Sequence, residues 1–136
     1  MNTATSYNQL LPIVLTDTRG RISLKMVCWP MGNDFVVTLS GGDVEHIGAV
    51  AVSYTSTNQT NSVKTIDKIA TNVIVVPKHK EDILVKTIAS LIAKTLSITV
   101  CVICGIHTKH ILEHELKDIV EMSEEMTNNL ILRLTI

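Results

Sequence analysis

Three short polar segments contain the residue types that could do chemistry in this chain. They are GGDVEH at 41–46, PKHKE at 77–81 and GIHTKH at 105–110, and each lies where a predicted strand ends or begins. Glycine permits positive φ and lets backbone N–H groups approach a ligand closely. Imidazole and ammonium groups donate hydrogen bonds to anions. If the fold brings these segments together, they predict a binding site for a phosphate or carboxylate.

Each segment also has a structural interpretation. The pair Gly41-Gly42 is typical of a tight hairpin turn, and His46 is compatible with a buried histidine whose polar atoms are satisfied. PKHKE predicts the first turn of a helix, whose unpaired N–H groups and dipole favour an anion beside Lys78, His79 and Lys80. A solvated first turn is the alternative for that segment.

A metal site is an alternative for the third segment. His110 and His114 are four residues apart and would share one face of a helix, and His46 or His107 could supply a third zinc ligand. The order of residues does not match the H-E-x-x-H motif, which would also supply a general base. We therefore expect no metal, and the alternative set of ligands is His107, His110 and His114.

The three cysteines do not indicate redox chemistry. Cys101 and Cys104 form C-x-x-C inside an apolar run, where their odd spacing directs the two side chains to opposite faces of a strand. With Cys28 they make an odd number, which fits reduced thiols better than a disulfide framework. The sequence contains no nucleophile elbow, phosphate loop or dinucleotide fingerprint. We therefore expect no catalytic residues.

Strands are predicted to position the first two segments. Alternating apolar and polar residues predict a half-buried strand over 21–30, whose inward residues are Ile22, Leu24, Met26 and Cys28. Turn residues and β-branched runs predict further strands at 35–40, 46–56 and 69–76, with an exposed loop or irregular hairpin at 55–65. Short connections between the first three strands predict an antiparallel meander.

Two helices and one more strand complete the predicted fold. Apolar residues at helical spacing predict an amphipathic helix of about 17 residues that begins near Lys78, with a buried stripe of Ile83, Leu84, Thr87, Ile88, Leu91, Ile92 and Leu96. The apolar run 97–106 predicts a central strand covered on both faces. In the second helix the predicted buried residues are Leu112, Leu116, Ile119, Val120 and Met126. We expect this helix to continue through LILRLTI rather than break at Asn128-Asn129 into a strand.

Length and composition predict one α+β domain over residues 1–136 with a largely antiparallel sheet. The 136 residues are 46% hydrophobic but only 3% aromatic, so the core consists of aliphatic side chains. The net charge of −1 does not favour binding to nucleic acid. The N-terminus lacks a signal-peptide pattern and no uncharged run reaches about 18 residues, which predicts a cytoplasmic protein that does not enter a membrane. The positive mean hydropathy, +0.30, makes a homo-oligomer plausible.

Taken together, GGDVEHIGAVAVS, PKHKE and GIH resemble a known family. This family is the small, prenylated-flavin chaperone-like accessory subunit of UbiD-type hydroxyarylic acid decarboxylases. The order of strands and helices is more distantly similar to proteasome assembly chaperones. The chain departs from the family pattern at two positions. Lys78 stands where members usually have glycine, and Thr108 stands where members usually have an acid after the last histidine.

The resemblance implies a non-catalytic accessory protein that binds or delivers prenylated flavin mononucleotide (FMN), or aids maturation of the decarboxylase. It also implies two partners, the UbiD-type decarboxylase and its flavin prenyltransferase. The expected cofactor-binding residues are Gly41, Gly42, Asp43, His46, Gly48, Lys78, His79, Lys80, Gly105 and His107. Trp29 and Tyr54 are the nearby aromatic candidates for the flavin. The alternatives are an assembly chaperone that acts through protein–protein contacts only, and a small metal-dependent enzyme that uses His107, His110 and His114.

Overall fold

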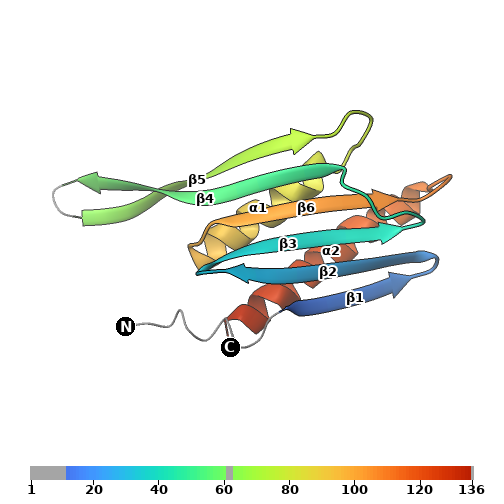
Figure 1. Cartoon of the computed structure of the whole chain (residues 1–136), viewed down its shortest axis with the longest axis horizontal. Coiled ribbons are helices and arrows are strands. Elements are labelled where there is room, and N and C mark those ends of the chain that lie inside the picture. The colour runs from blue at the N-terminus through green and yellow to red at the C-terminus, as the bar shows by residue number, and fades with distance from the viewer. Residues whose placement is uncertain (1–11, 61–62, 136) are drawn as a thin grey trace.

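Six strands and two helices make up the part of the chain that the computed structural model describes, residues 12–60 and 63–135 (Figure 1). In chain order they are β1 (Ile13–Arg19), β2 (Ile22–Met31), β3 (Asp34–Gly42), β4 (Ala49–Thr60), β5 (Val63–Val75), α1 (Asp82–Leu96), β6 (Val100–His107) and α2 (Glu113–Leu134). The strands form one sheet, and the helices lie side by side on one of its faces (Figure 1). None of the described helices has the length and apolar character needed to cross a membrane.

The order of strands in the sheet is β1-β2-β3-β6-β4-β5. Every neighbouring pair is antiparallel except β3 and β6, which are parallel. This confirms the α+β class with a largely antiparallel sheet. The predicted meander is wrong after β3, because β6 lies between β3 and β4. Local turn signals predict which strands follow one another in sequence, but not a strand inserted from much later in the chain.

Alternation of buried and exposed residues confirms the face assigned to β2. Ile22, Leu24, Met26 and Cys28 are all buried on the face that the helices cover. The strand β6 alternates in the same way, with Val102 and Cys104 buried and Ile103 half-buried. The expectation that β6 is covered on both faces is therefore wrong. Both helices lie on the same side, and the described residues leave the other face uncovered.

Two further details of the sheet differ from the prediction. The sequence analysis does not predict β1, because only the first three residues of IVLTDTR are apolar and its C-terminal half is polar, as is common at a sheet edge. The polar segment 55–65 belongs to a long hairpin of β4 and β5, with an irregularity in register between Ser56 and Thr57. Its connecting residues, 61 and 62, lie outside the described part of the chain.

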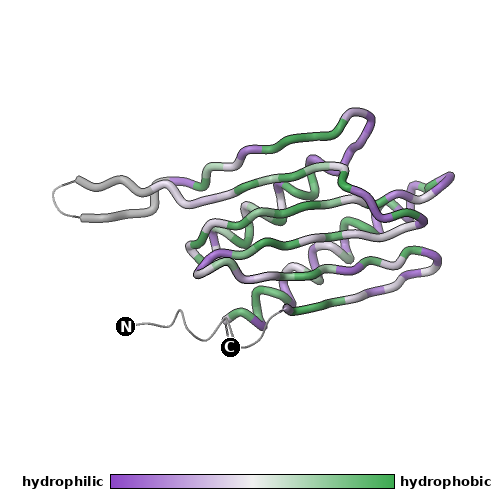
Figure 2. Tube along the Cα trace, in the orientation of Figure 1, coloured by the Kyte–Doolittle hydropathy of each residue, from purple (hydrophilic) through white to green (hydrophobic). Residues whose placement is uncertain are grey.

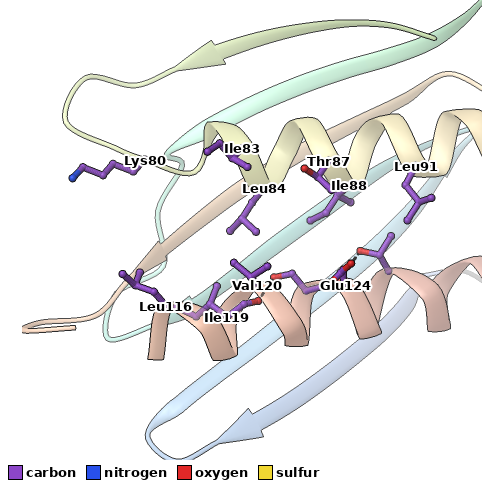
Figure 3. A pocket seen from close by; sticks show the side chains of 12 residues that line it. Lys80, Ile83, Leu84, Thr87, Ile88, Leu91, Leu116, Ile119, Val120 and Glu124 are labelled. Atoms are coloured by element: carbon purple, nitrogen blue, oxygen red, sulfur yellow. Dashed lines mark hydrogen bonds between the residues drawn. The ribbon is translucent and has the colours of Figure 1, made fainter. Parts of the chain in front are cut away.

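The first helix begins later than predicted. Lys78 has φ 72°, in the left-handed region, and Glu81 is the N-cap, so Asp82 is the first helical residue. Residues that face the sheet are Val85, Ile88, Ala89, Ile92 and Ala93. The predicted stripe is therefore only partly buried. Leu84 and Leu91 point toward α2 (Figure 3), and Ile83 and Thr87 are exposed. The second helix does continue past Asn128-Asn129 to Leu134, as expected.

One end of the sheet collects the polar loops. The parallel strands β3 and β6 both end there, and so does β5, before the chain enters α1 (Figure 1). Figure 2 shows hydrophilic residues concentrated in these loops, while hydrophobic residues run along the strands. The three polar segments at 41–46, 77–81 and 105–110 therefore meet at one end of the molecule.

Candidate ligand-binding site

Three histidines from the three polar segments converge. His46 Nε2 lies 3.0 Å from His79 Nδ1, and the ring centroids of these residues are 4.5 Å apart. The ring of His107 stands edge-on to that of His46, with 6.2 Å between the centroids. The imidazoles of His46 and His79 are partly buried, whereas His107 is exposed. Residues that are far apart along the chain thus share one surface.

Glycines allow the loop before β4 to cross the end of β6. A Cβ atom on Gly105 would collide with the carbonyl oxygen of His46, so only glycine lets the two backbones approach this closely. Gly48 N–H donates to the carbonyl oxygen of Cys104, with 2.8 Å between the atoms. These contacts fix the loop, and with it His46, directly above the last residues of β6.

The loop before α1 is held against the same place. Val76 N–H donates to the carbonyl oxygen of Gly48 (2.8 Å), and His79 N–H donates back to the carbonyl oxygen of Val76 (3.1 Å). Lys78, His79 and Lys80 precede the helix, so the prediction that they form its first turn is wrong. The left-handed residue at Lys78 turns the chain before the helix begins, and it directs His79 toward His46.

Glu81 is a site residue that the sequence analysis missed. Its side chain is only 9% exposed, and its Oε1 accepts a hydrogen bond from Ile106 N–H (3.3 Å) and lies 3.4 Å from His46 Nε2. Its Oε2 has no hydrogen-bond partner among the described residues. The feature of the sequence that could have revealed this residue is a glutamate at the N-cap of α1, where Ser, Thr, Asp and Asn are the usual residues.

Residues after β6 complete this end of the sheet. Asp43 N–H donates to the carbonyl oxygen of His107 (2.6 Å), and Asp43 Oδ2 accepts from Lys109 N–H (2.8 Å). Asp43 therefore joins two loops through its own hydrogen bonds. The Thr108 hydroxyl is buried and has no hydrogen-bond partner in the part of the chain that the structure describes. It is a second site residue that the sequence analysis missed.

A cleft of about 290 Å³ opens beside these residues. We call it the polar cleft because its walls carry Lys78, His79, Lys80, Glu81, His107 and Thr108 beside the aliphatic Leu84, Ile106, Ile111, Leu116 and Ile119. An apolar groove of about 330 Å³ adjoins it between α1 and α2 (Figure 3). Leu84, Ile88 and Leu91 line one wall of the groove, while Leu116, Ile119 and Val120 line the other. The cleft and the groove share Lys80, Leu84, Leu116 and Ile119, so they adjoin one another.

Comparison with known proteins assigns a family to this fold. The family model described as the prenylated flavin chaperone LpdD-like domain matches residues 18–135. The chain belongs to this family. The match covers all three polar segments and both helices.

A solved structure shares the fold of this LpdD-like chain. It is titled "Crystal Structure of a Novel Chaperone Complex for Yeast 20S Proteasome Assembly", with a TM-score of 0.55 and 8% sequence identity, and the match covers 88% of this chain and 93% of that chain. At this identity the similarity concerns the fold alone. A comparison with curated proteins found no match.

The predicted site residues of the LpdD-like chain divide into two groups. His46, His79 and His107 converge, and Lys78 and Lys80 line the cleft. The glycines do not open space for a ligand, because the place of each missing Cβ is filled by the chain itself: by Ser23 and Leu24 at Gly41, His107 at Gly42, Glu81 at Gly48 and His46 at Gly105. The hairpin-turn interpretation of Gly41-Gly42 is wrong, since both residues lie in β3.

The aromatic candidates lie elsewhere. Trp29 and Tyr54 are 49% and 40% exposed and stand on the uncovered face of the sheet, opposite the helices. Among the described residues they therefore have no part in the cleft or the groove. The walls of the groove are aliphatic, as the low aromatic content predicts.

The predicted helical pair of histidines does not form. His110 has φ 52° and precedes α2, whose first residue is Glu113, so His110 and His114 do not share a helix face. In the described residues, the His, Cys, Asp and Glu side chains whose donor atoms converge in one group are His46, His79 and Glu81. The expected geometry of a site made by His107, His110 and His114 is therefore wrong.

The cysteines stand as predicted. Cys104 faces the helices and is buried, whereas Cys101 is half-buried on the opposite face. Burial raises the pKa of the Cys28 thiol to about 12, and burial together with Glu81 raises the pKa of Cys104 to about 12. Thiols with raised pKa values are poor nucleophiles and poor redox groups. Cys28 and Cys104 therefore belong to the core.

Proposed function

We propose that this chain binds reduced prenylated FMN and passes it to a UbiD-type decarboxylase without catalysing a reaction itself. Membership of a prenylated flavin chaperone family supports the general role. Binding, delivery and the identity of the partner enzymes, the decarboxylase and its flavin prenyltransferase, are the parts that we propose. When bound to the decarboxylase, the prenylated flavin supplies the decarboxylation chemistry.

One observation supports the proposal most strongly, the adjacency of the polar cleft to the apolar groove. Prenylated FMN has a charged phosphate at one end and a large, mostly apolar ring system at the other. A site for such a molecule needs adjoining regions of opposite polarity. The cleft and the groove meet at Lys80, Leu84, Leu116 and Ile119, and each has a volume near the lower limit of ordinary ligand pockets.

The residues of the cleft suit the phosphate. Lys78 and Lys80 supply positive charge, and the imidazoles of His79 and His107 can donate hydrogen bonds. The buried Thr108 hydroxyl lacks a partner among the described residues, and a phosphate oxygen would satisfy it.

The groove suits the ring system. Its aliphatic walls, including Leu84, Ile88 and Val120, exclude water without offering an aromatic ring for stacking. Binding of the flavin then depends on apolar contact and on the phosphate end. A carrier that must release its ligand benefits from this arrangement, because the ligand is covered but not clamped.

A matched pair of variants in α2 tests the proposal. Leu116→Glu places a carboxylate at the junction of the cleft and the groove, and Leu132→Glu makes the same change near the end of the helix. Both leucines are more than half exposed, so neither change removes core packing. In anaerobic fluorescence titrations with reduced prenylated FMN, we expect Leu116→Glu to weaken binding by tenfold or more and Leu132→Glu to leave it unchanged. Equal affinities for the two variants, or no binding by the unmodified chain, would refute the proposed site.

The second candidate is an assembly chaperone that acts through protein contacts alone. The uncovered apolar face of the sheet favours it, because Trp29 and Ile74 are large apolar side chains exposed there. Activation of the apo-decarboxylase separates the two functions. A flavin carrier requires binding of the ligand, so Leu116→Glu should lose activation in proportion to its lost affinity. Full activation by a variant that binds no flavin would favour the contact-only function.

A further inference from the structure

Three electron-pair donors converge beside the cleft. They are His46 Nε2, His79 Nδ1 and a carboxylate oxygen of Glu81, all within 4.8 Å of one another. His46 Nε2 lies 3.0 Å from His79 Nδ1 and 3.4 Å from Glu81 Oε1, and His79 Nδ1 lies 3.9 Å from Glu81 Oε2. Donor atoms bound to zinc at about 2.0–2.1 Å in a tetrahedral arrangement are separated by roughly 3.3–3.4 Å. The observed spacings lie on both sides of that value.

With both rings neutral, the hydrogen bonds of this group leave Glu81 Oε2 without a donor among the described residues. His46 Nδ1 lies 3.4 Å from the carbonyl oxygen of Val44, which can only accept, so this contact favours the tautomer with the proton on Nδ1. In this neutral tautomer, Nε2 carries a lone pair that faces both His79 and Glu81. At most one proton, on His79 Nδ1, lies among the three converging atoms when both rings are neutral.

The contact between His46 Nδ1 and the carbonyl oxygen of Val44 is of the kind that metal-bound histidines make. Histidines that ligate metals donate their second ring N–H to a backbone carbonyl or a carboxylate, which fixes the tautomer and aims the other nitrogen at the ion. The contact of His46 with Val44 has this form, although at 3.4 Å it is long.

Glu81 provides a second, independent indication of a cation site. Its side chain is nine-tenths buried, and Oε2 has no hydrogen-bond donor among the described residues. A Cβ atom on Gly48 would overlap this carboxylate in its present position, so glycine leaves room for it there. A buried carboxylate oxygen without a partner is costly unless a cation lies next to it.

We propose that His46, His79 and Glu81 bind one divalent transition-metal ion of the zinc, iron(II) or manganese(II) class. Two imidazoles and a carboxylate suit these ions, whereas calcium and magnesium prefer oxygen ligands throughout. Three protein ligands leave one or more coordination positions open. His79 and Glu81 line the polar cleft, so the open positions can accept water or an anionic oxygen of a ligand. This inference does not depend on flavin binding, because all three metal-binding side chains belong to this chain and converge in its fold.

Titration with metal alone tests the inference. Tag-free protein is stripped with a chelator and titrated with zinc chloride by calorimetry, and with cobalt(II) chloride by visible absorption. We expect one equivalent to bind per chain, and His79→Ala to weaken binding by tenfold or more. The matched control is His114→Ala, which removes an exposed histidine of α2 outside the group. Binding of less than a tenth of an equivalent, or an equal loss in both variants, would overturn the proposal.

A second variant and a second readout guard against misfolding. Glu81→Gln keeps an oxygen that can accept the hydrogen bond from Ile106 N–H while it removes the negative charge, so the fold should persist and the metal affinity should fall. Zinc should raise the thermal midpoint of the unmodified chain and of His114→Ala, because a ligand that binds only the folded state stabilises it. An equal rise for His79→Ala would show that zinc binds elsewhere.

Discussion

At the scale of single residues, the sequence predicts the histidines of the site but not the groups that join them. His46, His79 and His107 are recognisable because each stands beside glycines or lysines at the end of an apolar run. Glu81 and Thr108 are not, because their importance comes from burial and from atoms without partners, which only the fold reveals. The sequence pattern suggests glycines that approach a ligand, but in the fold they permit contacts within the chain.

The left-handed conformation of Lys78 yields a prediction. Lys78 has φ 72°, where a residue with a Cβ atom costs about 1–2 kcal/mol and glycine does not. Because glycine also gains freedom in the unfolded chain, we expect Lys78→Gly to leave the free energy of unfolding unchanged or to raise it by up to about 1 kcal/mol. Urea unfolding of the purified variant measures this change.

The control for that variant is Lys80→Gly, which removes the same charge at a residue without positive φ. It should lower the free energy of unfolding by about 0.4–1 kcal/mol. If Lys78→Gly lowers the free energy of unfolding as much as this control does, a strained left-handed conformation at Lys78 is contradicted.

At the scale of elements, local pattern predicts the helices and most strands, and it fails where the decision is non-local. The alternation in β2 and the length of α2 are confirmed. The insertion of β6 between β3 and β4 depends on pairing between distant segments, which turn residues do not encode. The apolar stripe predicted for α1 is also wider than the face that the sheet covers. Its remaining apolar residues build the groove against α2.

A partly buried ion pair attaches α2 to the turn between β1 and β2 and makes stability depend on pH. Arg21 donates from Nε to Glu115 Oε2 (2.7 Å) and from Nη2 to Oε1 (2.8 Å), and Leu112 N–H donates to the same carboxylate. These hydrogen bonds, first that of Arg21 and then that of Leu112, lower the pKa of Glu115 to about 2 from its usual 4.5. A carboxyl with a lowered pKa stabilises the fold above its unfolded-state value, and this contribution is lost as pH falls.

We therefore expect the stability of the unmodified chain to decline between pH 4.5 and pH 2 in part through Glu115. Glu115→Gln should be less stable at pH 7 and should show a shallower decline across that interval. Thermal unfolding as a function of pH measures both effects, with Glu113→Gln, an exposed acid of the same turn, as the control. Parallel curves for Glu115→Gln and the unmodified chain would contradict the assignment.

At the scale of the whole molecule, the uncovered face of the sheet is the feature that needs a partner. One row of directly paired residues crosses all six strands on this face, in the order Val14, Val27, Thr38, Ile103, Val50 and Ile74. Six strands of seven or more residues extend roughly 24 Å in each direction, a footprint on the order of 600 Å². That area approaches the ~800 Å² per partner of a stable interface, so a second copy of the chain can cover it.

A charge at the centre of this row tests the predicted homo-oligomer. Thr38→Lys introduces an ammonium group between Val27 and Ile103 without removing an apolar side chain from the core. We expect sedimentation analysis to show a dimer for the unmodified chain and for Leu132→Lys on α2, and a weakened dimer, by tenfold or more in the dissociation constant, for Thr38→Lys. A monomeric unmodified chain, or a Thr38→Lys dimer of full strength, would contradict self-association through the sheet.

A map of where reduced prenylated FMN binds is the most direct test of the proposed site. Amide chemical shifts of nitrogen-15-labelled protein, recorded without oxygen during a titration, report the location of the ligand. We predict the largest changes at Lys80, Thr108 and Leu116, around the junction of the cleft and the groove, and negligible changes at Val27 on the uncovered face. Changes concentrated on the uncovered face, or no saturable changes at all, would contradict a ligand site at this end of the sheet.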